Sequence, residues 1–232
     1  MNMTHLFKDV MNKVFAYSNY DLVNNVITLC LLPKLRYWAS LEIISSMRGY
    51  EGPLLDLGAG DGSMTRYVLK LGLKPKFIVL LDPAINGLLS IRDLRQEMVD
   101  KVVAVGEALP LRSSSIQIIY TAFALRQFNN KAIALTEVRR VLRKGGSLVV
   151  LEFWRPDNAL AHIVLIYYLT AILPLLISLV APRTIKEYLT MRDTIKGIGS
   201  ISWLRSLINK FVGDVISSRK YMGIFTIIRA RK

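Results

Sequence analysis

The chain has 232 residues, of which 52% are hydrophobic and 21% are charged, and its 31 basic and 17 acidic side chains give a net charge of +14. These proportions exclude a disordered or fibrous chain, and the length predicts one domain with a sizeable core rather than two. The basic excess favours an anionic partner, either nucleic acid or phospholipid headgroups, and charge alone does not distinguish them.

The first fifty residues are predicted to form helices in front of a core. Residues 1–10 lack the apolar run of a signal peptide. Helical spacing of apolar residues begins at Phe7, a second apolar stretch over 22–32 is expected to stop at Pro33, and a third helix is expected over 35–47. Because Cys30 is the only cysteine and no His/Cys cluster occurs, neither a disulfide nor a metal site is expected, and the cytoplasm is the expected compartment.

Strands and helices then alternate in a regular order. This alternation predicts a parallel sheet covered on both faces, and right-handed crossovers make it a doubly wound α/β sheet. The last two strands lie close together in sequence and are expected to pair as an antiparallel hairpin at the sheet edge. The expected strands are 54–57, 77–81, 101–105, 116–121, 147–153, 212–219 and 224–229, and the expected helices are 63–71, 86–98, 131–142, 184–196 and 202–211.

A glycine-rich stretch between the first strand and its helix is the strongest binding signal. Asp56 is followed by Gly58, Gly60 and Gly62. Glycines at alternate positions allow positive φ angles and let a ligand approach the main chain at a helix N-terminus. The acid within the motif would repel a pyrophosphate and suits a positive group such as an ammonium. The alternative is a glycine-rich turn that binds nothing.

This stretch resembles the first motif of the class I S-adenosylmethionine (SAM) methyltransferases, in which the glycine loop passes under the methionine and ribose of the cofactor. The resemblance implies SAM as the cofactor and S-adenosylhomocysteine as the product. It places Asp56, Gly58, Ala59, Gly60 and Thr65 against the cofactor.

The ends of the next strands supply further candidates, because ligands in open α/β sheets bind at the carboxyl ends of the strands. Asp82, which precedes Pro83, could accept hydrogen bonds from both ribose hydroxyls, and the alternative is a surface aspartate that caps the next helix. After the third strand, methyltransferases of this kind usually have Asp or Asn, whereas this chain has Val105. Adenine recognition is therefore expected to be more apolar and to use the Gly106 N–H and Glu107.

A sharper resemblance covers residues 12–232. It is carried by YTAFALRQF at 120–128 together with ALP at 108–110, VLRKGG at 141–146, VLEF at 150–153, YDLVN at 20–24, RYW at 36–38 and GIFTII at 223–228. In this order the motifs resemble the quinone-biosynthesis C-methyltransferases, which methylate demethylmenaquinone and the ubiquinone precursor. The departures are Val105, Gln117 where Asp is common, Gln127 where Asn is usual, and a more apolar segment after residue 153.

Arg126 follows the fourth strand, and no helical periodicity explains it. It could hold a phenolate oxygen by charge-assisted hydrogen bonds, and the alternative is a surface salt bridge. His162 could act as a base, although a lone histidine at a helix start is more often structural. The implied catalytic residues are Arg126, Tyr20 and Asp21, the implied substrate contacts are Asn24, Phe123, Arg126 and Tyr167, and Ala122 is added to the cofactor contacts.

Residues 163–181 are nineteen consecutive positions without a formal charge, which reaches the lower length of a membrane-spanning helix. Three alternatives remain open. The segment could span a bilayer, with Pro174 interrupting it, or it could be a buried core helix. It could also be a helix pair or hairpin that forms an apolar lid at the mouth of the site and meets lipid or a lipid-like substrate.

We therefore expect a single domain over residues 1–232 with a Rossmann-like methyltransferase fold and a seven-stranded, mostly parallel sheet. Its parts are a helical cap (1–50), a SAM-binding core (51–153), an apolar helical insertion on the substrate side (154–211) and closing antiparallel strands (212–232).

The expected activity is SAM-dependent C-methylation of a prenylated hydroquinone or similar lipophilic ring, at the inner face of an anionic membrane. One alternative is another acceptor, such as a lipid headgroup, a small metabolite or RNA, although no RNA-binding module or aromatic stacking platform accompanies the basic residues. Another is a membrane-associated subunit that binds SAM without turnover.

Overall fold

The computed structural model describes residues 3–17, 19–47, 52–94, 98–196, 199–221 and 224–232. A seven-stranded sheet runs through the molecule in the order β3-β2-β1-β4-β5-β7-β6, with β7 antiparallel to both of its neighbours and the other pairings parallel. The strands are β1 (Leu54–Leu57), β2 (Ile78–Leu81), β3 (Val99–Val102), β4 (Ile116–Ala122), β5 (Leu142–Phe153), β6 (Asp214–Tyr221) and β7 (Phe225–Arg231).

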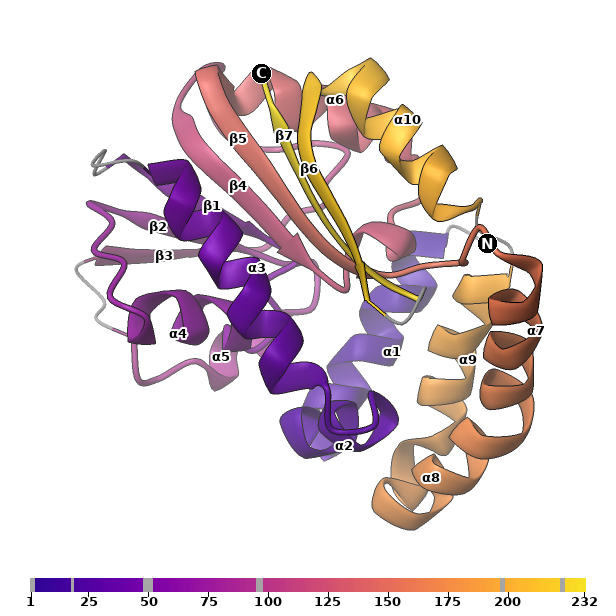
Figure 1. The fold of residues 1–232 in the computed structure, drawn as a ribbon. Coiled ribbons are helices and arrows are strands. Elements are labelled where there is room, and N and C mark those ends of the chain that lie inside the picture. Colours follow the sequence, from indigo (N-terminus) through magenta and orange to yellow (C-terminus); the bar gives the residue numbers. More distant parts are fainter. Residues whose placement is uncertain (1–2, 18, 48–51, 95–97, 197–198, 222–223) are drawn as a thin grey trace.

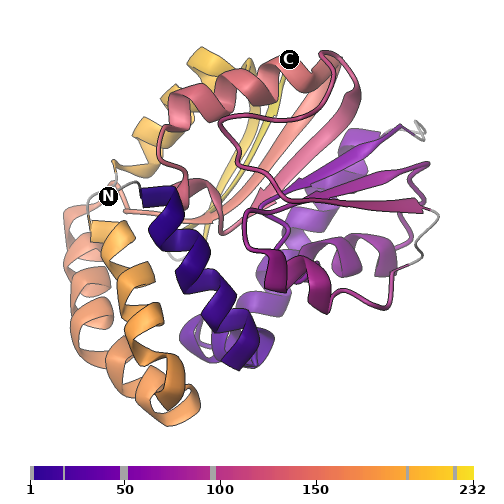
Figure 2. The same ribbon diagram turned by 180° about the vertical axis from the view of Figure 1, so that it is seen from behind.

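Helices cover both faces of this sheet (Figures 1 and 2). Apolar side chains of α6 and α10 pack on one face, and those of α3, α4 and α5 pack on the other. A third apolar cluster lies beyond the carboxyl ends of the parallel strands and contains side chains of α1, α2, α7, α8 and α9. The helices are α1 (Met3–Tyr17), α2 (Tyr20–Ile27), α3 (Leu32–Met47), α4 (Ser63–Lys70), α5 (Ile85–Ser90), α6 (Lys131–Val141), α7 (Ala159–Tyr167), α8 (Leu173–Val180), α9 (Ile185–Lys196) and α10 (Ile201–Phe211).

The architecture confirms the predicted doubly wound α/β fold and the closing antiparallel hairpin. The hydrophobic runs of β1 and β2 are buried at every position, as a parallel sheet covered on both faces requires. This order of strands brings the ends of β1, β2 and β4 to one edge, where the glycine loop lies.

The helix expected over 86–98 is wrong over 91–94, and residues 95–97 of that prediction lie outside the described residues. Ile91 has an extended backbone and is buried, and its side chain would meet a Cβ placed on Gly62 at 3.0 Å. Asp93 then receives two hydrogen bonds from Arg66 of α4, at 2.6 and 2.7 Å. These tertiary contacts end the helix, and β3 begins at Val99 and ends at Val102 instead of covering 101–105.

Pro33 was expected to stop a helix, but it lies in the first turn of α3. The preceding helix α2 ends at Ile27, and the turn that follows contains Leu29 and Cys30 at positive φ. A proline is tolerated in a first turn because its missing N–H would have no helical partner there.

Residues 143–146, which precede the strand expected over 147–153, belong to β5 as an irregular start. The sheet register shifts between Ile116 and Ile118, and the Gly145 N–H donates to the Lys232 carbonyl at 2.9 Å. The final residues of the chain therefore supply the hydrogen-bond partner that lets this glycine-containing segment continue as a strand.

The apolar segment is one helical run from Ala159 to Val180. Its middle, Tyr168–Ile172, is a π-helix that connects α7 to α8. Pro174 lies directly after it and therefore does not interrupt the run, because a π-turn relieves the clash between a proline ring and the preceding turn. A short 3-10 turn, Pro182–Thr184, then leads into α9.

Candidate functional site

Three neighbouring hollows open at the carboxyl ends of β1, β2 and β4. The Asp82 hollow, which contains Asp82, has a volume of about 630 Å³, and the Asp56 hollow, which contains Asp56, has about 340 Å³. The apolar hollow, which is lined by residues of α2, α3, α8, α9 and the π-turn and by residues at the ends of the strands, has about 710 Å³. Tyr20 and Phe123 line all three, so the hollows meet at these two side chains.

The Asp82 hollow contains a carboxylate held by the backbone around it. Its two oxygens accept hydrogen bonds from Gly60 N at 2.9 Å and from Ala84 N at 2.7 Å. Burial raises the pKa of Asp82 to about 6, and these two hydrogen bonds limit the rise. Asp82 therefore fixes the glycine loop and also faces a space where a hydroxyl could bind.

The Asp56 hollow has a second buried carboxylate beside the loop. Thr65 Oγ1 donates to Asp56 Oδ2 at 2.6 Å and is itself 2.7 Å from the Tyr120 hydroxyl. Burial raises the pKa of Asp56 to about 7, although the Thr65 hydrogen bond works in the opposite direction. Thr65, which was predicted to contact the cofactor, does not line any of the three hollows and instead orients Asp56 from behind.

The other predicted cofactor residues come together in space. They line the Asp56 hollow, the Asp82 hollow or both, which we call the two acidic hollows. These residues are Asp56, Gly58, Ala59, Gly60, Asp82, Pro83, Gly106, Glu107 and Ala122. Val105 and Gln127, two of the departures from the family pattern, also line the Asp82 hollow. The side chain at 105 is thus beside the site but offers only apolar contact.

Two glycines keep the loop in its shape. Gly58 has a φ of +79°, and a Cβ built on it would lie 2.3 Å from the Cβ of Ala124. A Cβ on Gly87 of α5 would lie 2.8 Å from the carbonyl group of Gly60. Sequence reasoning missed Gly87, because a glycine inside a helix gives no sign of the backbone that approaches it.

Arg36 is the clearest functional candidate that sequence reasoning did not select. It is buried and lines both the Asp56 hollow and the apolar hollow. Its Nη1 donates to Asp21 Oδ1 at 2.8 Å, and its guanidinium lies 5.7 Å from the ring of Tyr67. The RYW motif was the only sequence feature that pointed to Arg36, since the sequence does not show which face of a helix an arginine occupies.

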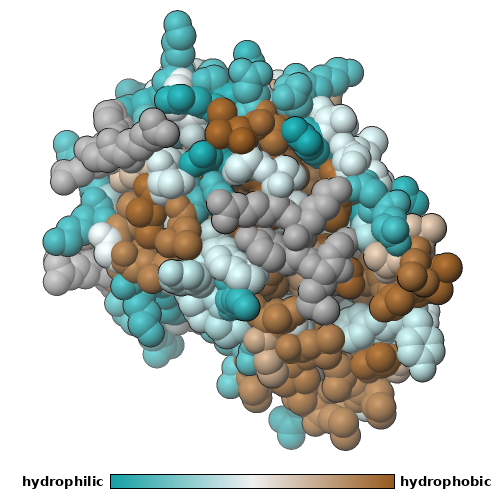
Figure 3. Space-filling model, in the orientation of Figure 1, coloured by the Kyte–Doolittle hydropathy of each residue, from teal (hydrophilic) through white to brown (hydrophobic). Residues whose placement is uncertain are grey.

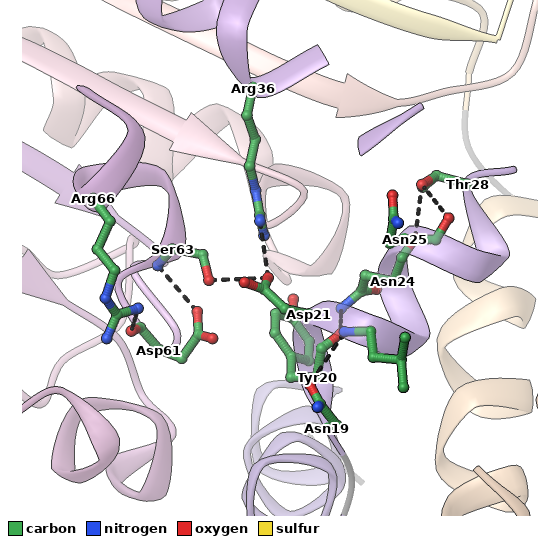
Figure 4. Close-up of polar contacts among 11 residues, drawn as sticks. Asn19, Tyr20, Asp21, Asn24, Asn25, Thr28, Arg36, Asp61, Ser63 and Arg66 are labelled. Carbon is green, nitrogen blue, oxygen red and sulfur yellow. Dashed lines mark hydrogen bonds and ion pairs between the residues drawn. The ribbon is translucent and has the colours of Figure 1, made fainter. Parts of the chain in front are cut away.

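Asp21, predicted to be catalytic, does not line any of the three hollows. Its Oδ1 accepts hydrogen bonds from Arg36 of α3 and from Ser63 Oγ, at 3.0 Å, at the start of α4 (Figure 4). Asp21 therefore clips α2 to two other helices and keeps Tyr20 over the site. The catalytic role of Asp21 stays a prediction, because these contacts show only what its carboxylate binds.

Arg126 lines the apolar hollow, and it forms a buried ion pair with Glu152 rather than the surface salt bridge that was the alternative. Its Nη1 donates to Glu152 Oε1 and to the Phe123 carbonyl, and its backbone N–H donates to Glu152 Oε2 at 3.2 Å. Glu152 is fully buried and Arg126 is 7% exposed. The Nε of Arg126 is buried and has no hydrogen-bond partner among the described residues.

Phe123 has a φ of +59°, a conformation that a non-glycine residue rarely adopts. Its N–H donates to the Leu151 carbonyl at 2.8 Å, and its own carbonyl accepts from Arg126 at 2.7 Å. Such backbone strain persists where surrounding contacts impose it, and it is common at functional sites. Here it places a ring where the three hollows meet.

The helical run Ala159–Val180 contributes to the apolar hollow with Tyr168, Leu169, Leu173 and Ile177. Tyr167, expected beside the substrate, lies instead on the outer face and is 64% exposed. His162, a candidate base, lines none of the three hollows. The apolar hollow is also lined by Tyr20, Asn24, Phe123 and Arg126, which were candidates for catalysis or substrate contact.

The two buried aspartates predict an unusual pH dependence of stability. Because their pKa values in the folded protein lie above the ordinary value of 3.8, the folded state binds more protons than the unfolded state between about pH 4 and pH 7. The free energy of unfolding is therefore expected to fall as the pH rises through this window. The carboxyls with lowered pKa values, Asp93 and Glu137, lose their stabilising effect only in more acidic solution.

Urea unfolding at pH 5 and pH 8 checks this expectation. The Asp56→Asn variant should lose less stability than the wild type between these two pH values, because it lacks one titrating carboxyl. An identical pH dependence in variant and wild type would show that burial does not raise the pKa of Asp56.

The chain resembles known proteins along nearly its whole length. Residues 2–230 match the ubiE/COQ5 methyltransferase family. A demethylmenaquinone methyltransferase from Lactiplantibacillus plantarum is 31% identical, over 82% of this chain and 80% of that protein. A ubiquinone/menaquinone biosynthesis C-methyltransferase from Hahella chejuensis is 32% identical, over 79% of this chain and 75% of its own length.

Solved structures are similar in fold at low sequence identity. A SAM-dependent methyltransferase from Thermotoga maritima superimposes with a TM-score of 0.57 at 20% identity and covers 99% of each chain. Another, from Aquifex aeolicus, gives a TM-score of 0.53 at 16% identity, over 78% of this chain and 82% of its own. At these identities the likeness concerns the fold.

Proposed function

The chain belongs to the ubiE/COQ5 methyltransferase family and is a SAM-dependent methyltransferase, and from this premise we propose that it methylates a ring carbon of a reduced, prenylated quinone. The observation that carries the proposal is the junction of the hollows. The apolar hollow meets both acidic hollows at Tyr20 and Phe123, so a lipophilic acceptor and a polar methyl donor would come together there.

The two acidic hollows fit the parts of SAM. Asp56 is a buried carboxylate that suits the ammonium group, and the buried guanidinium of Arg36 suits the carboxylate of the methionine part. Asp82 suits the ribose hydroxyls, and Val105 with Gly106 would contact the adenine. Bound SAM supplies an electrophilic methyl group carried on a sulfonium.

The apolar hollow suits a quinol ring with a prenyl chain. Its lining is mostly aliphatic and aromatic, and its other polar residues are Asn24, Thr28, Arg36, Arg126 and Arg192. The unpartnered Nε of Arg126 could donate to a ring oxygen, and the Arg126–Glu152 pair holds the guanidinium in place. Burial raises the pKa of Tyr20, so its hydroxyl keeps its proton at neutral pH and acts as a hydrogen-bond donor.

These residues would favour attack by carbon. An ionised ring hydroxyl pushes electron density onto the neighbouring ring carbon, which forms the new bond to the methyl group as the sulfur–methyl bond breaks. The proton on that carbon then leaves to water, which restores the aromatic ring. Alignment and charge placement are the contributions of the protein.

Methyl transfer from radiolabelled SAM tests the proposal. The purified protein is incubated with a reduced quinone extract, with phospholipid vesicles and with RNA in parallel. We expect the label in the quinone fraction only. Label in RNA or in phospholipid would establish another acceptor, and SAM binding without transfer to any acceptor would indicate a non-catalytic subunit. Either result would overturn the proposal.

A further inference from the structure

We propose that the outer face of the helical run Ala159–Val180 docks on an anionic phospholipid surface and brings the mouth of the apolar hollow to the lipid. This inference rests on the proposed function, because a lipophilic acceptor would enter from that surface. Among the described residues, this run is the one helix that is long and apolar enough to cross a membrane by length and composition.

The outer face of the run is mostly apolar, and its exposed Thr170 and Ser178 donate their hydroxyl hydrogens to backbone carbonyls of the same run. Six side chains are more than half exposed, which is unusual for large apolar residues of a soluble helix. In Figure 3 hydrophobic atoms gather over the region where Figure 1 places α7 and α8. These six side chains, which we call the apolar stripe, are Leu160, Ile163, Val164, Tyr167, Leu175 and Leu179.

The inner face of the same run is committed to the protein. Leu165, Leu169, Leu173 and Ile177 recur every four residues, are buried, and pack in the cluster formed with α1 and α2. A helix that spanned a bilayer would have to leave this cluster, whereas a helix that lies along the interface keeps it. We therefore place the run in the interfacial plane, with its outer face towards the lipid.

The helical run that carries the stripe also forms one wall of the apolar hollow. The buried residues Leu169, Leu173 and Ile177 line that hollow from one side. The end of α2, which packs against α8, lines it from the other side with Ile27. The turn after α2 exposes a further apolar side chain, Leu29. Docking by the stripe would thus bring this wall of the hollow, and the exposed Leu29 beside its other wall, close to the hydrocarbon boundary.

Charge selects an anionic lipid over a neutral one. The segment 163–181 has no formal charge, but the exposed Arg183 and Lys186 follow it at once. Lys13, which contacts Glu187 of α9 at 3.6 Å, is also largely exposed. With a net charge of +14 for the chain, the apolar stripe is next to a basic rim that suits phospholipid headgroups.

Vesicle flotation tests the docking face. Wild-type protein is mixed with vesicles of phosphatidylglycerol and phosphatidylcholine, or of phosphatidylcholine alone. We expect flotation with the anionic vesicles and weaker flotation with the neutral ones. The Leu175→Glu/Leu179→Glu variant should bind the anionic vesicles at least about tenfold more weakly, because it places two carboxylates against the lipid.

A matched control introduces the same charges elsewhere. Ile133 of α6 and Ile216 of β6 are 49% and 50% exposed, and Ile133→Glu/Ile216→Glu should float like the wild type apart from a small effect of net charge. Equal SAM binding by all three proteins shows that they are folded. As a second readout, Cys30 on the α2–α3 turn is exposed and is the only cysteine, so an environment-sensitive fluorophore attached there should shift its emission on anionic vesicles.

Three results would overturn the docking proposal. The first is that the wild-type protein stays in the soluble fraction. The second is that the control variant loses as much flotation as the Leu175→Glu/Leu179→Glu variant. The third is that the wild type is a dimer that binds no vesicles and that the Leu175→Glu/Leu179→Glu variant is a monomer. A water-soluble short-chain quinol separates this proposal from the proposed function. Methylation of that quinol without flotation refutes docking alone, and flotation without methylation refutes the function alone.

Discussion

The Asp82→Ala variant is expected to bind SAM roughly a thousandfold more weakly than the wild type. Asp82 would accept two hydrogen bonds from the ribose, and charge-assisted bonds of this kind contribute about 2 kcal/mol each, which gives about 4 kcal/mol in total. The same carboxylate accepts hydrogen bonds from Gly60 N and Ala84 N, so its loss also releases the glycine loop. Isothermal titration calorimetry measures the effect directly.

Asp100 supplies the matched control for this variant. It is an exposed aspartate of β3, outside the three hollows, and Asp100→Ala changes the net charge by the same amount. SAM affinity should be unaffected in that variant. If Asp82→Ala bound SAM as tightly as Asp100→Ala does, the assignment of the Asp82 hollow to the ribose would be wrong.

The Glu152→Ala variant is expected to lose about 3–5 kcal/mol of stability and nearly all methyl transfer. Removing Glu152 leaves the guanidinium of Arg126 buried without its counter-ion, and an uncompensated buried charge has a cost of this size. It also removes the group that fixes Arg126 beside the apolar hollow. Urea unfolding and the labelled-SAM assay measure the two effects separately.

A double variant separates stability from function at this pair. Arg126→Met/Glu152→Gln removes both buried charges, which is often neutral for stability, and keeps an amide oxygen at 152 that can accept from the backbone N–H groups that Glu152 serves. We expect it to unfold near the wild-type urea concentration and still to transfer no methyl group. Recovery of activity in the double variant would show that the pair serves only the fold, and a loss below about 1 kcal/mol in Glu152→Ala would contradict the buried ion pair itself.

The fold was predictable where each element had its own pattern. The apolar run before Asp56 and the helical spacing after Asn130 predicted β1 and α6 almost to the residue. The end of α5 was not predictable, because it depends on Ile91 packing at Gly62 and on Asp93 pairing with Arg66 of another helix. Such contacts between distant segments leave no local trace in the sequence.

The site was predictable where glycines and acids follow strands. Residues such as Asp56 and Asp82 lie at positions that the topology brings together. The partners of those residues were harder to find. In the uniformly apolar segment after residue 162, no polar positions mark the outer face, so Tyr167 could not be distinguished from Tyr168.

The ion pairs were also hidden, for a different reason. Arg126 was selected from its place after a strand, but its partner Glu152 lies 26 residues later within another strand. A buried glutamate in a strand indicates that a positively charged partner exists, but it does not indicate which residue that partner is. Similarly, the Asp21–Arg36 contact depends on how α2 and α3 pack against each other, which the sequence does not show.

Carbon-13 NMR of the product tests the central claim most directly. The protein is incubated with SAM labelled at its methyl carbon and with a reduced, ring-unmethylated naphthoquinol that has a short prenyl chain. We predict a labelled methyl group bonded to a ring carbon, and no transfer to the oxidised quinone, which lacks an ionisable hydroxyl. A labelled methoxy carbon, or equal transfer to the oxidised form, would contradict carbon methylation driven by a phenolate in the apolar hollow.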